Sequence, residues 1–275
     1  LFNTIAMRIS PINKIANQKR KQMKKQKMDK VRVKFAQAHM EMLNYSVFTF
    51  FGIVVMYSQK WIWPHVEWWK NQPEKNFLTR DIIFFYVAYA ARYLQAFVSV
   101  FLEKKRKDFW EMQIHHLATI CLVVLSYQVG YVKIGCIIMV LMDTADPALH
   151  TAKQVVYFRD LATGRLQKTF ATVGDIIFVI FIIIFTTTRM GLYPFVCYTA
   201  IADNAELRGV SVTLENFIKM STPVEKGMLS LLAILMILQI VWFYYLCVVL
   251  YKVFAGKEID DSRSDSEYSD SEGID

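Results

Sequence analysis

The stretch Leu229–Tyr251, LSLLAILMILQIVWFYYLCVVLY, decides the class of this protein because it contains no charged residue. A helix of this length crosses the hydrocarbon layer of a bilayer, which takes about 20 apolar residues. The rest of the chain agrees, since 55% of its 275 residues are hydrophobic, 20% are charged and the mean hydropathy is +0.27. This composition excludes an ordinary soluble domain. The sequence therefore predicts an all-α polytopic membrane protein, because helices satisfy their own backbone hydrogen bonds inside lipid.

Outward from that stretch, the apolar runs predict six transmembrane helices. They cover Met40–Ser58, Ile82–Leu102, Gln113–Tyr131, Lys133–Tyr157, Phe170–Phe195 and Met228–Lys252. Because the connection between the third and the fourth is very short, these two helices are expected to be antiparallel neighbours. The fourth is expected to be one helix that carries Asp143 and Asp146, three residues apart, on a single face.

Charge is distributed unevenly along the chain, whose net charge is +8. Ten Lys or Arg residues lie between Lys14 and Lys34, and eight acidic residues lie between Glu258 and Asp275. Short loops rich in Lys and Arg stay in the cytosol, and this bias places both ends of the chain there. The basic arm suits anionic membrane lipids, and we expect no nucleic-acid partner. The predicted organisation is a basic arm over 1–34, a transmembrane domain over 35–254 and a disordered acidic tail over 255–275.

The acidic tail carries serines followed three residues later by an acidic side chain. They are Ser262, Ser264 and Ser269. This spacing is the pattern favoured by casein kinase 2-type enzymes, and phosphorylation would make the tail more negative. The alternative is a tail that serves only solubility.

Ionisable residues inside the predicted spans are the main functional signal. An ionisable side chain at the centre of a bilayer costs about 2.5–3.5 kcal/mol on insertion scales, so such residues mark functional sites. His115 and His116 begin the third span, while Asp143 and Asp146 lie in its expected neighbour. Two further cations belong to this set of candidates. Arg92, within the second span, is either a counter-charge for one of the aspartates or a substrate contact, and Lys153 follows Asp146 by two helical turns.

This combination of side chains permits proton transfer and acyl transfer. An imidazole takes a proton near neutral pH, and a carboxylate can fix its tautomer. An imidazole can also attack an activated acyl group as a nucleophile. The five histidines are too few and too scattered for the repeated histidine clusters of a membrane-embedded iron oxygenase, and the ligand spacing is not diagnostic of zinc. We therefore expect no metal.

The block Arg106–Thr119, RKDFWEMQIHHLAT, resembles the signature of the ceramide synthases, K-D-F-x-x-M-x-x-H-H-x-x-T. The segment Met142–Leu149, MDTADPAL, followed by Lys153, is similar to the rest of that motif. Many relatives have His where this chain has Met142, and some fungal-type members match this chain at that position. The resemblance is continuous over Lys107–Lys153 and weaker beyond it.

The resemblance implies a TLC-domain barrel of transmembrane helices, usually preceded by one more span, which would be absent before Leu1. It implies an enzyme of the endoplasmic reticulum that transfers a fatty acyl group from acyl-coenzyme A, as co-substrate, to the amine of a sphingoid base. No separate cofactor is expected. His115, His116, Asp143 and Asp146 would be catalytic. The expected substrate contacts are Arg92, Lys105, Arg106, Lys107, Asp108 and Lys153.

Three points stay open at the level of sequence. His115 is either the nucleophile that forms an acyl-imidazole or the base that activates the amine. An accessory subunit or a dimer partner is compatible with the sequence but not indicated by it. The competing functions are a non-catalytic TLC protein that binds or senses lipid, a translocation-associated membrane protein, and a transporter, which would normally contain repeated spans.

Overall fold

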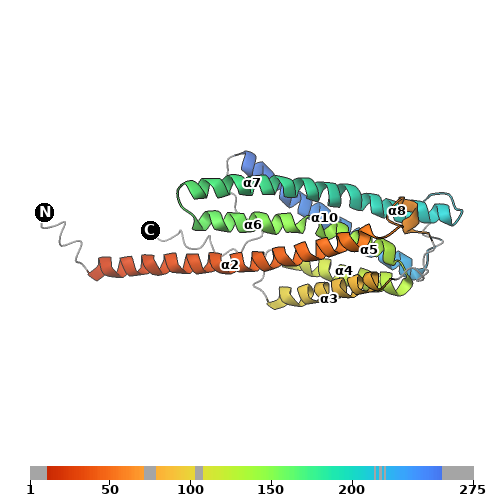
Figure 1. The fold of residues 1–275 in the computed structure, drawn as a ribbon, viewed down its shortest axis with the longest axis horizontal. Coiled ribbons are helices and arrows are strands. Elements are labelled where there is room, and N and C mark those ends of the chain that lie inside the picture. The colour runs from red at the N-terminus through yellow and green to blue at the C-terminus, as the bar shows by residue number, and fades with distance from the viewer. Residues whose placement is uncertain are drawn as a thin grey trace. The chain divides into compact units, whose positions relative to one another are not determined.

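The computed structural model describes residues 11–70, 79–102, 108–213, 215–216, 219 and 221–255, and within them every regular element is helical (Figure 1). The predicted all-α membrane class is confirmed. The long helices are α2 (Pro11–Tyr57), α3 (Arg80–Leu102), α4 (Phe109–Val129), α5 (Val132–Asp143), α6 (Asp146–Leu161), α7 (Arg165–Phe185), α8 (Tyr193–Leu207) and α10 (Pro223–Phe254). Two shorter elements are the 3-10 helix η1 (His65–Trp68) and the π-helix η2 (Thr186–Leu192).

Among the residues that the structure describes, five helical segments, rather than the expected six, are long and apolar enough to cross a membrane. They are Val31–Tyr57, Arg80–Leu102, Phe109–Val129, Arg165–Leu207 and Pro223–Lys252. The described chain is thus a multi-pass membrane protein. The expected fifth span falls within the long helical run Arg165–Leu207, in which η2 joins α7 to α8.

The expected fourth span, Lys133–Tyr157, is not one helix. A turn at Thr144 and Ala145 divides it into α5 and α6, each too short to cross a bilayer alone. Pro147 explains the division, because proline lacks an N–H and its ring clashes with the carbonyl four residues earlier. That carbonyl belongs to Asp143, and it accepts a hydrogen bond from Thr49 Oγ1 at 3.3 Å instead. Asp143 therefore ends α5 and Asp146 begins α6, instead of both lying in the single expected helix.

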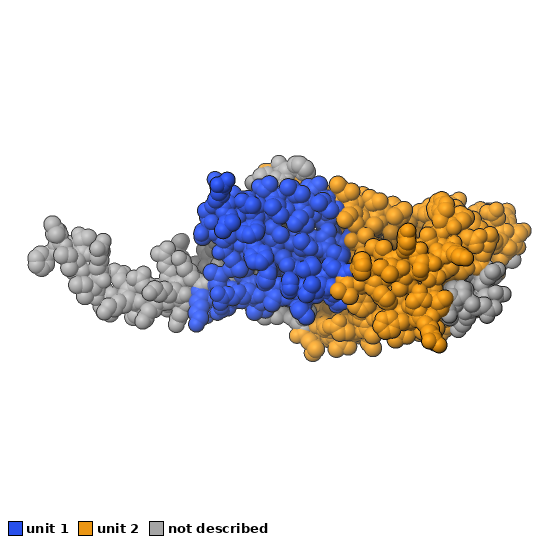
Figure 2. Space-filling model, in the orientation of Figure 1, with its two compact units in different colours: residues 1–46, 145–181 blue, residues 47–144, 182–275 orange. Residues whose placement is uncertain are grey.

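The chain divides into two compact units, coloured separately in Figure 2. Unit 1 comprises residues 1–46 and 145–181, and unit 2 comprises residues 47–144 and 182–275. In unit 1, α6 packs against α7, with the rings of Phe158 and Phe170 stacked at 5.7 Å. The Phe158 ring also meets that of Phe35 of α2 edge-on at 4.7 Å.

Unit 2 is built around α4, which packs against α3 on one side and against α10 on another (Figure 1). Its core contains the fully buried α3 side chains Ile82, Phe85 and Tyr89. The neighbouring Tyr86 ties three helices together, because its hydroxyl lies 3.1 Å from Ser126 Oγ of α4 and donates to the Val132 carbonyl of α5 at 3.3 Å. The side chains of α3 thereby fix α4 and α5 relative to each other.

Gly135 of α5 allows this close packing, so Gly135→Ala is expected to destabilise the protein by about 1–3 kcal/mol. An added Cβ would lie 1.7 Å from Tyr86 Oη and 2.9 Å from Cζ of that buried, rigid ring. Thermal and denaturant unfolding in detergent measure the loss. Gly227→Ala is the matched control, because a Cβ there meets nothing within 4 Å. An unchanged stability for Gly135→Ala would contradict the tight approach.

Candidate functional site

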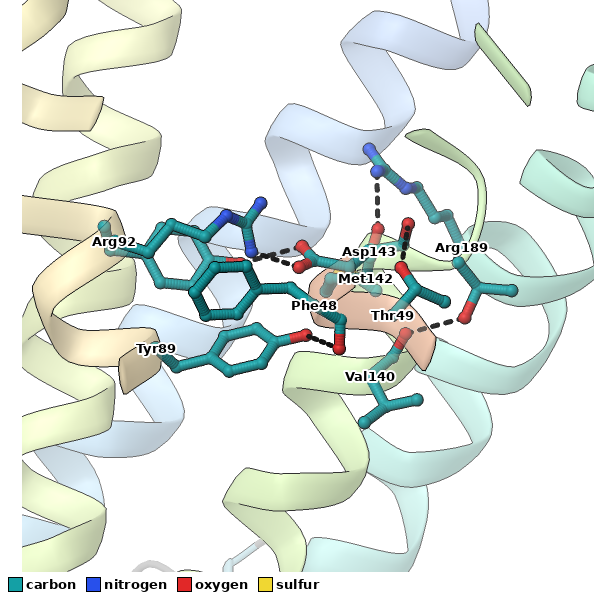
Figure 3. A network of polar contacts seen from close by, with 10 residues as sticks. Phe48, Thr49, Tyr89, Arg92, Val140, Met142, Asp143 and Arg189 are labelled. Atoms are coloured by element: carbon teal, nitrogen blue, oxygen red, sulfur yellow. Dashed lines mark hydrogen bonds and ion pairs between the residues drawn. The ribbon is translucent and has the colours of Figure 1, made fainter. Parts of the chain in front are cut away.

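A buried ion pair between Asp143 and Arg92 forms the centre of a polar network in unit 2 (Figure 3). Asp143 is the last residue of α5 and is 2% exposed, while Arg92 of α3 is 8% exposed. Tyr93, the next residue of α3, donates its hydroxyl to Asp143 Oδ1 at 3.2 Å. Both carboxylate oxygens are thus held by groups of α3.

Aromatic rings surround the Arg92 guanidinium. Its central carbon lies 5.0 Å from the ring centroid of Phe48, 5.4 Å from that of Tyr89 and 5.2 Å from that of Tyr93. Cation–π attraction of this kind is strongest where the cation is removed from water. These rings and the Asp143 carboxylate explain how an arginine is accommodated at this depth.

The carboxyl end of α5 is also held by residues from other helices. Met142 carbonyl accepts a hydrogen bond from Arg189 Nη2 at 2.6 Å, as Figure 3 shows. The last carbonyls of a helix lack partners within it, and a cation suits their partial negative charge. Arg189 Nη1 also donates to Gln239 Oε1 of α10 at 3.3 Å, and Gln239 is fully buried. The end of α5 is therefore fixed by η2 and α10 together.

Arg189 was not among the site residues expected from sequence. The available signal was an arginine within an apolar run, the same signal that singled out Arg92. Arg189 belongs to the π-helix η2, and π-helical turns occur frequently at functional sites. Its position inside the network makes it a candidate that sequence reasoning missed.

The two histidines follow each other on α4 and face different surroundings. His116 is 4% exposed, and its ring centroid lies 6.3 Å from that of Tyr93, the tyrosine that binds Asp143. The His115 ring meets that of Trp242 of α10 at 5.1 Å. Within the described residues, the Nδ1 atom of neither histidine has a hydrogen-bond partner. The structure thus brings His115, His116, Asp143 and Arg92 into one region of unit 2.

His115 also lines an apolar pocket with an empty volume of about 880 Å³, including its open part. The pocket is bounded mainly by α4, α5, α8 and α10. Its lining includes Leu122 and Val123 of α4, Ile138 of α5 and Leu232 of α10. An imidazole at the border of such a pocket can exchange a proton with, or attack, a polar group attached to a long apolar chain.

Tyr131, Asn204 and Glu225 line the pocket at the opposite end of α4 from His115. Glu225 accepts hydrogen bonds from the Tyr131 hydroxyl and from Arg208 Nη2, the latter at 2.6 Å. The hydrogen bond to Glu225 raises the pKa of Arg208 above its ordinary value, so the ion pair stays formed. Glu225 also accepts from the backbone N–H of Thr222 at 2.8 Å, which completes a capping box at the start of α10.

The remaining expected site residues fall in three places. Asp108 immediately precedes α4 and is 5% exposed. Asp146 and Lys153 lie on α6 in unit 1, which is described separately from the histidines. The expected phosphate-binding and phosphorylated residues lie outside the described part of the chain: Lys105, Arg106, Lys107, Ser262, Ser264 and Ser269.

No group of three or more His, Cys, Asp or Glu side chains placed to hold a metal ion occurs within the described ranges. The absence of a metal and of a separate cofactor stays a prediction. The arrangement of His115 beside an apolar pocket permits acid–base or acyl-transfer chemistry using protein side chains.

Comparison with known proteins identifies relatives along most of the chain. The family model for the TLC domain matches residues 34–248. Ceramide synthase 5 of Homo sapiens is 32% identical over 243 residues, covering 87% of this chain and 56% of that protein. Sphingosine N-acyltransferase lag1 of Schizosaccharomyces pombe is 26% identical over 244 residues, with coverages of 88% and 60%. Ceramide Synthase FUM18 of Gibberella moniliformis is 26% identical over 270 residues, with coverages of 88% and 61%. The chain spans little more than half the length of these relatives.

Proposed function

The chain belongs to the TLC domain family, and from this premise we propose that it is a ceramide synthase, which transfers a fatty acyl group from acyl-coenzyme A to the amine of a sphingoid base. The observation that carries the proposal is the position of the His115 imidazole on the wall of an apolar pocket in a membrane protein. The names of the similar proteins support the type of reaction.

The pocket suits an acyl chain in length and in character. His115 and Tyr131 both line it, and the helical rise of α4 from His115 to its last residue, Val129, is about 21 Å. Aliphatic side chains along this distance offer an alkyl chain an environment from which water is excluded. We propose that the fatty acyl chain of the substrate lies along α4, with its thioester at His115 and its terminal methyl group towards Tyr131.

Two routes are compatible with this arrangement. The amine of a sphingoid base resembles lysine and is mostly protonated at neutral pH, so it must lose a proton before it attacks. His115 either removes that proton or first takes the acyl group as a nucleophile. We propose that three further side chains position His115 and compensate the charge that it gains: His116, Asp143 and Asp146. Arg92, which is bound to Asp143, would act through that carboxylate.

We propose the endoplasmic reticulum membrane as the location, with both ends of the chain in the cytosol, where acyl-coenzyme A is available. Lys105, Arg106, Lys107 and Lys153 are proposed to contact the phosphates of coenzyme A, with Asp108 close to the entrance of the site. Phosphorylation of Ser262, Ser264 and Ser269 is likewise proposed as a property of the tail.

The test is an assay of purified protein with radiolabelled acyl-coenzyme A and sphinganine. The expected result is an N-acylated product that requires both substrates. Stoichiometric binding of the lipid without any product would contradict the proposal and favour a non-catalytic lipid-binding TLC protein.

Intact-mass measurement separates the two routes. Protein incubated with acyl-coenzyme A alone should gain the mass of one acyl group if His115 is the nucleophile, and this adduct should disappear when sphinganine is added. An unmodified mass together with full turnover in the presence of the base would show that transfer is direct.

Ala200→Leu is expected to shorten the pocket and to shift the preferred acyl chain to a shorter length. Ala200 lines the pocket on α8, and the adjacent Thr199 accepts a hydrogen bond at 3.2 Å from Trp69, whose ring contacts Tyr131. The added bulk therefore lies towards the Tyr131 end. The measurement is turnover across a series of acyl-coenzyme A donors.

The matched control for that substitution is Ala91→Leu, at an exposed position on α3. It should leave the profile of chain lengths unchanged. An unaltered profile in Ala200→Leu would contradict the placement of the acyl chain in this pocket.

A further inference from the structure

We propose that Trp242 is a further catalytic residue, whose indole N–H donates a hydrogen bond to the carbonyl oxygen of the acyl group as it reacts at His115. This inference rests on the function proposed above. It assigns a chemical role to a residue of α10, outside the motif that contains the histidines and aspartates.

Trp242 is buried and close to the reacting imidazole. It is 7% exposed, and its ring meets that of His115 edge-on, with centroids 5.1 Å apart and planes at 69°. The indole nitrogen can only donate, and within the described ranges Nε1 of Trp242 has no partner. An unpaired buried donor is costly, and the cost is removed when a substrate brings an acceptor to it.

The position of Trp242 follows from the face of α10 that it occupies. Leu235, Gln239 and Trp242 are spaced by four and three residues, so they lie along one side of the helix. Leu235 lines the pocket. Gln239 binds Arg189 and lies 3.7 Å from the sulfur of Met142, which attaches this side of α10 to the end of α5. Trp242 follows Gln239 on the same side of α10 and contacts His115, which itself lines the pocket.

The chemistry requires a donor at this place. When the nucleophile, either a nitrogen of His115 or the sphingoid amine, bonds to the thioester carbon, the π electrons of the carbonyl move onto its oxygen. The oxyanion then re-forms the carbonyl, the carbon–sulfur bond breaks and coenzyme A leaves as the thiolate. In the two-step route, the amine attacks the acyl-imidazole through a second oxyanion, whose collapse breaks the bond between the acyl carbon and the His115 nitrogen and restores the free imidazole. The amine loses its proton and the thiolate gains one, so thioester and amine become amide and thiol.

A preorganised N–H is worth most where charge develops in a site without water. Because both routes pass through an oxyanion, the role of Trp242 is independent of which route operates. Trp242→Phe keeps an aromatic ring and removes the N–H, and it should lower kcat by about 100-fold with little change in KM.

Trp61→Phe is the matched control. Trp61 is also buried and has an Nε1 atom without a partner among the described residues, but it packs in the core cluster with Trp68 and Trp69. The Trp61→Phe variant should keep the wild-type kcat, although it too loses an indole N–H. Trp242→His, which retains a ring N–H, should recover part of the loss.

The readouts are amide formation and thiol release per folded molecule, with folding checked by thermal unfolding. A wild-type kcat in Trp242→Phe, or equal kcat values for Trp242→Phe and Trp242→His, would overturn the inference. An equal fall in Trp61→Phe would do the same. If the wild type releases thiol without forming amide, the proposed function fails, and slower thiol release by Trp242→Phe still supports the donor. A wild type that releases no thiol overturns both.

Discussion

Replacing His115 with alanine is expected to lower the rate of N-acyl product formation by about 10⁴-fold while the protein stays folded. His115 is the histidine on the pocket wall, beside Trp242, so the reacting carbonyl would meet it first. Its loss removes either the nucleophile or the base, and neither neighbouring helix offers a replacement imidazole at this point. Product formation by purified protein in detergent measures the effect.

His65→Gln provides the control for that experiment. His65 lies in η1, where its Nδ1 atom is 2.8 Å from Asp203 Oδ2, and it is not among the residues that line the pocket. Its substitution should leave turnover at the wild-type level. Full turnover by a folded His115→Ala protein would remove His115 from the site.

Replacing Asp143 with leucine is expected to destabilise the protein by about 3–5 kcal/mol, because the buried Arg92 cation would lose its carboxylate. The side chains of Arg92 and Asp143 are 6% and 3% exposed, so water cannot compensate for the loss. The rings around Arg92 stabilise a cation only in part. Denaturant unfolding of the single variant measures this loss.

The double variant Arg92→Met/Asp143→Leu should recover most of that stability, since no buried charge is left unpaired. It should nevertheless stay inactive if Asp143 also acts on the histidines through Tyr93, which separates the structural role from the functional one. Glu215→Gln is the control, because its exposed pair with Lys219 should contribute little. A stability of Asp143→Leu equal to the wild type would show that the ion pair is not formed.

Much of the fold was predictable from hydropathy. The charge-free stretch Leu229–Tyr251 lies inside α10, and the expected second span, Ile82–Leu102, differs from α3 by two residues at one end. Such segments are predictable because crossing a bilayer depends on a local sum of side-chain transfer energies. The prediction of a single helix over Lys133–Tyr157 was wrong. A sum of side-chain transfer energies does not include the backbone clash that Pro147 introduces.

For the candidate site, the sequence identified which side chains are costly in a membrane. Ionisable side chains are costly to place in lipid, so each of a small set of residues was identified individually: His115, His116, Asp143 and Arg92. It left open whether Arg92 accompanies Asp143 or Asp146, and the structure pairs Arg92 with Asp143. Arg189 and Trp242 carried too weak a local signal to be selected.

Sequence alone indicated a multi-pass helical membrane protein that carries histidines and carboxylates within its apolar segments. Both properties follow from composition along short segments. The folded protein was needed to show that Arg92 binds Asp143, that Arg189 holds the end of α5, and that His115 both lines the apolar pocket and contacts Trp242. The physical reason is that these contacts depend on which helix faces meet, and residues as distant in sequence as His115 and Trp242 become neighbours only when α4 packs against α10.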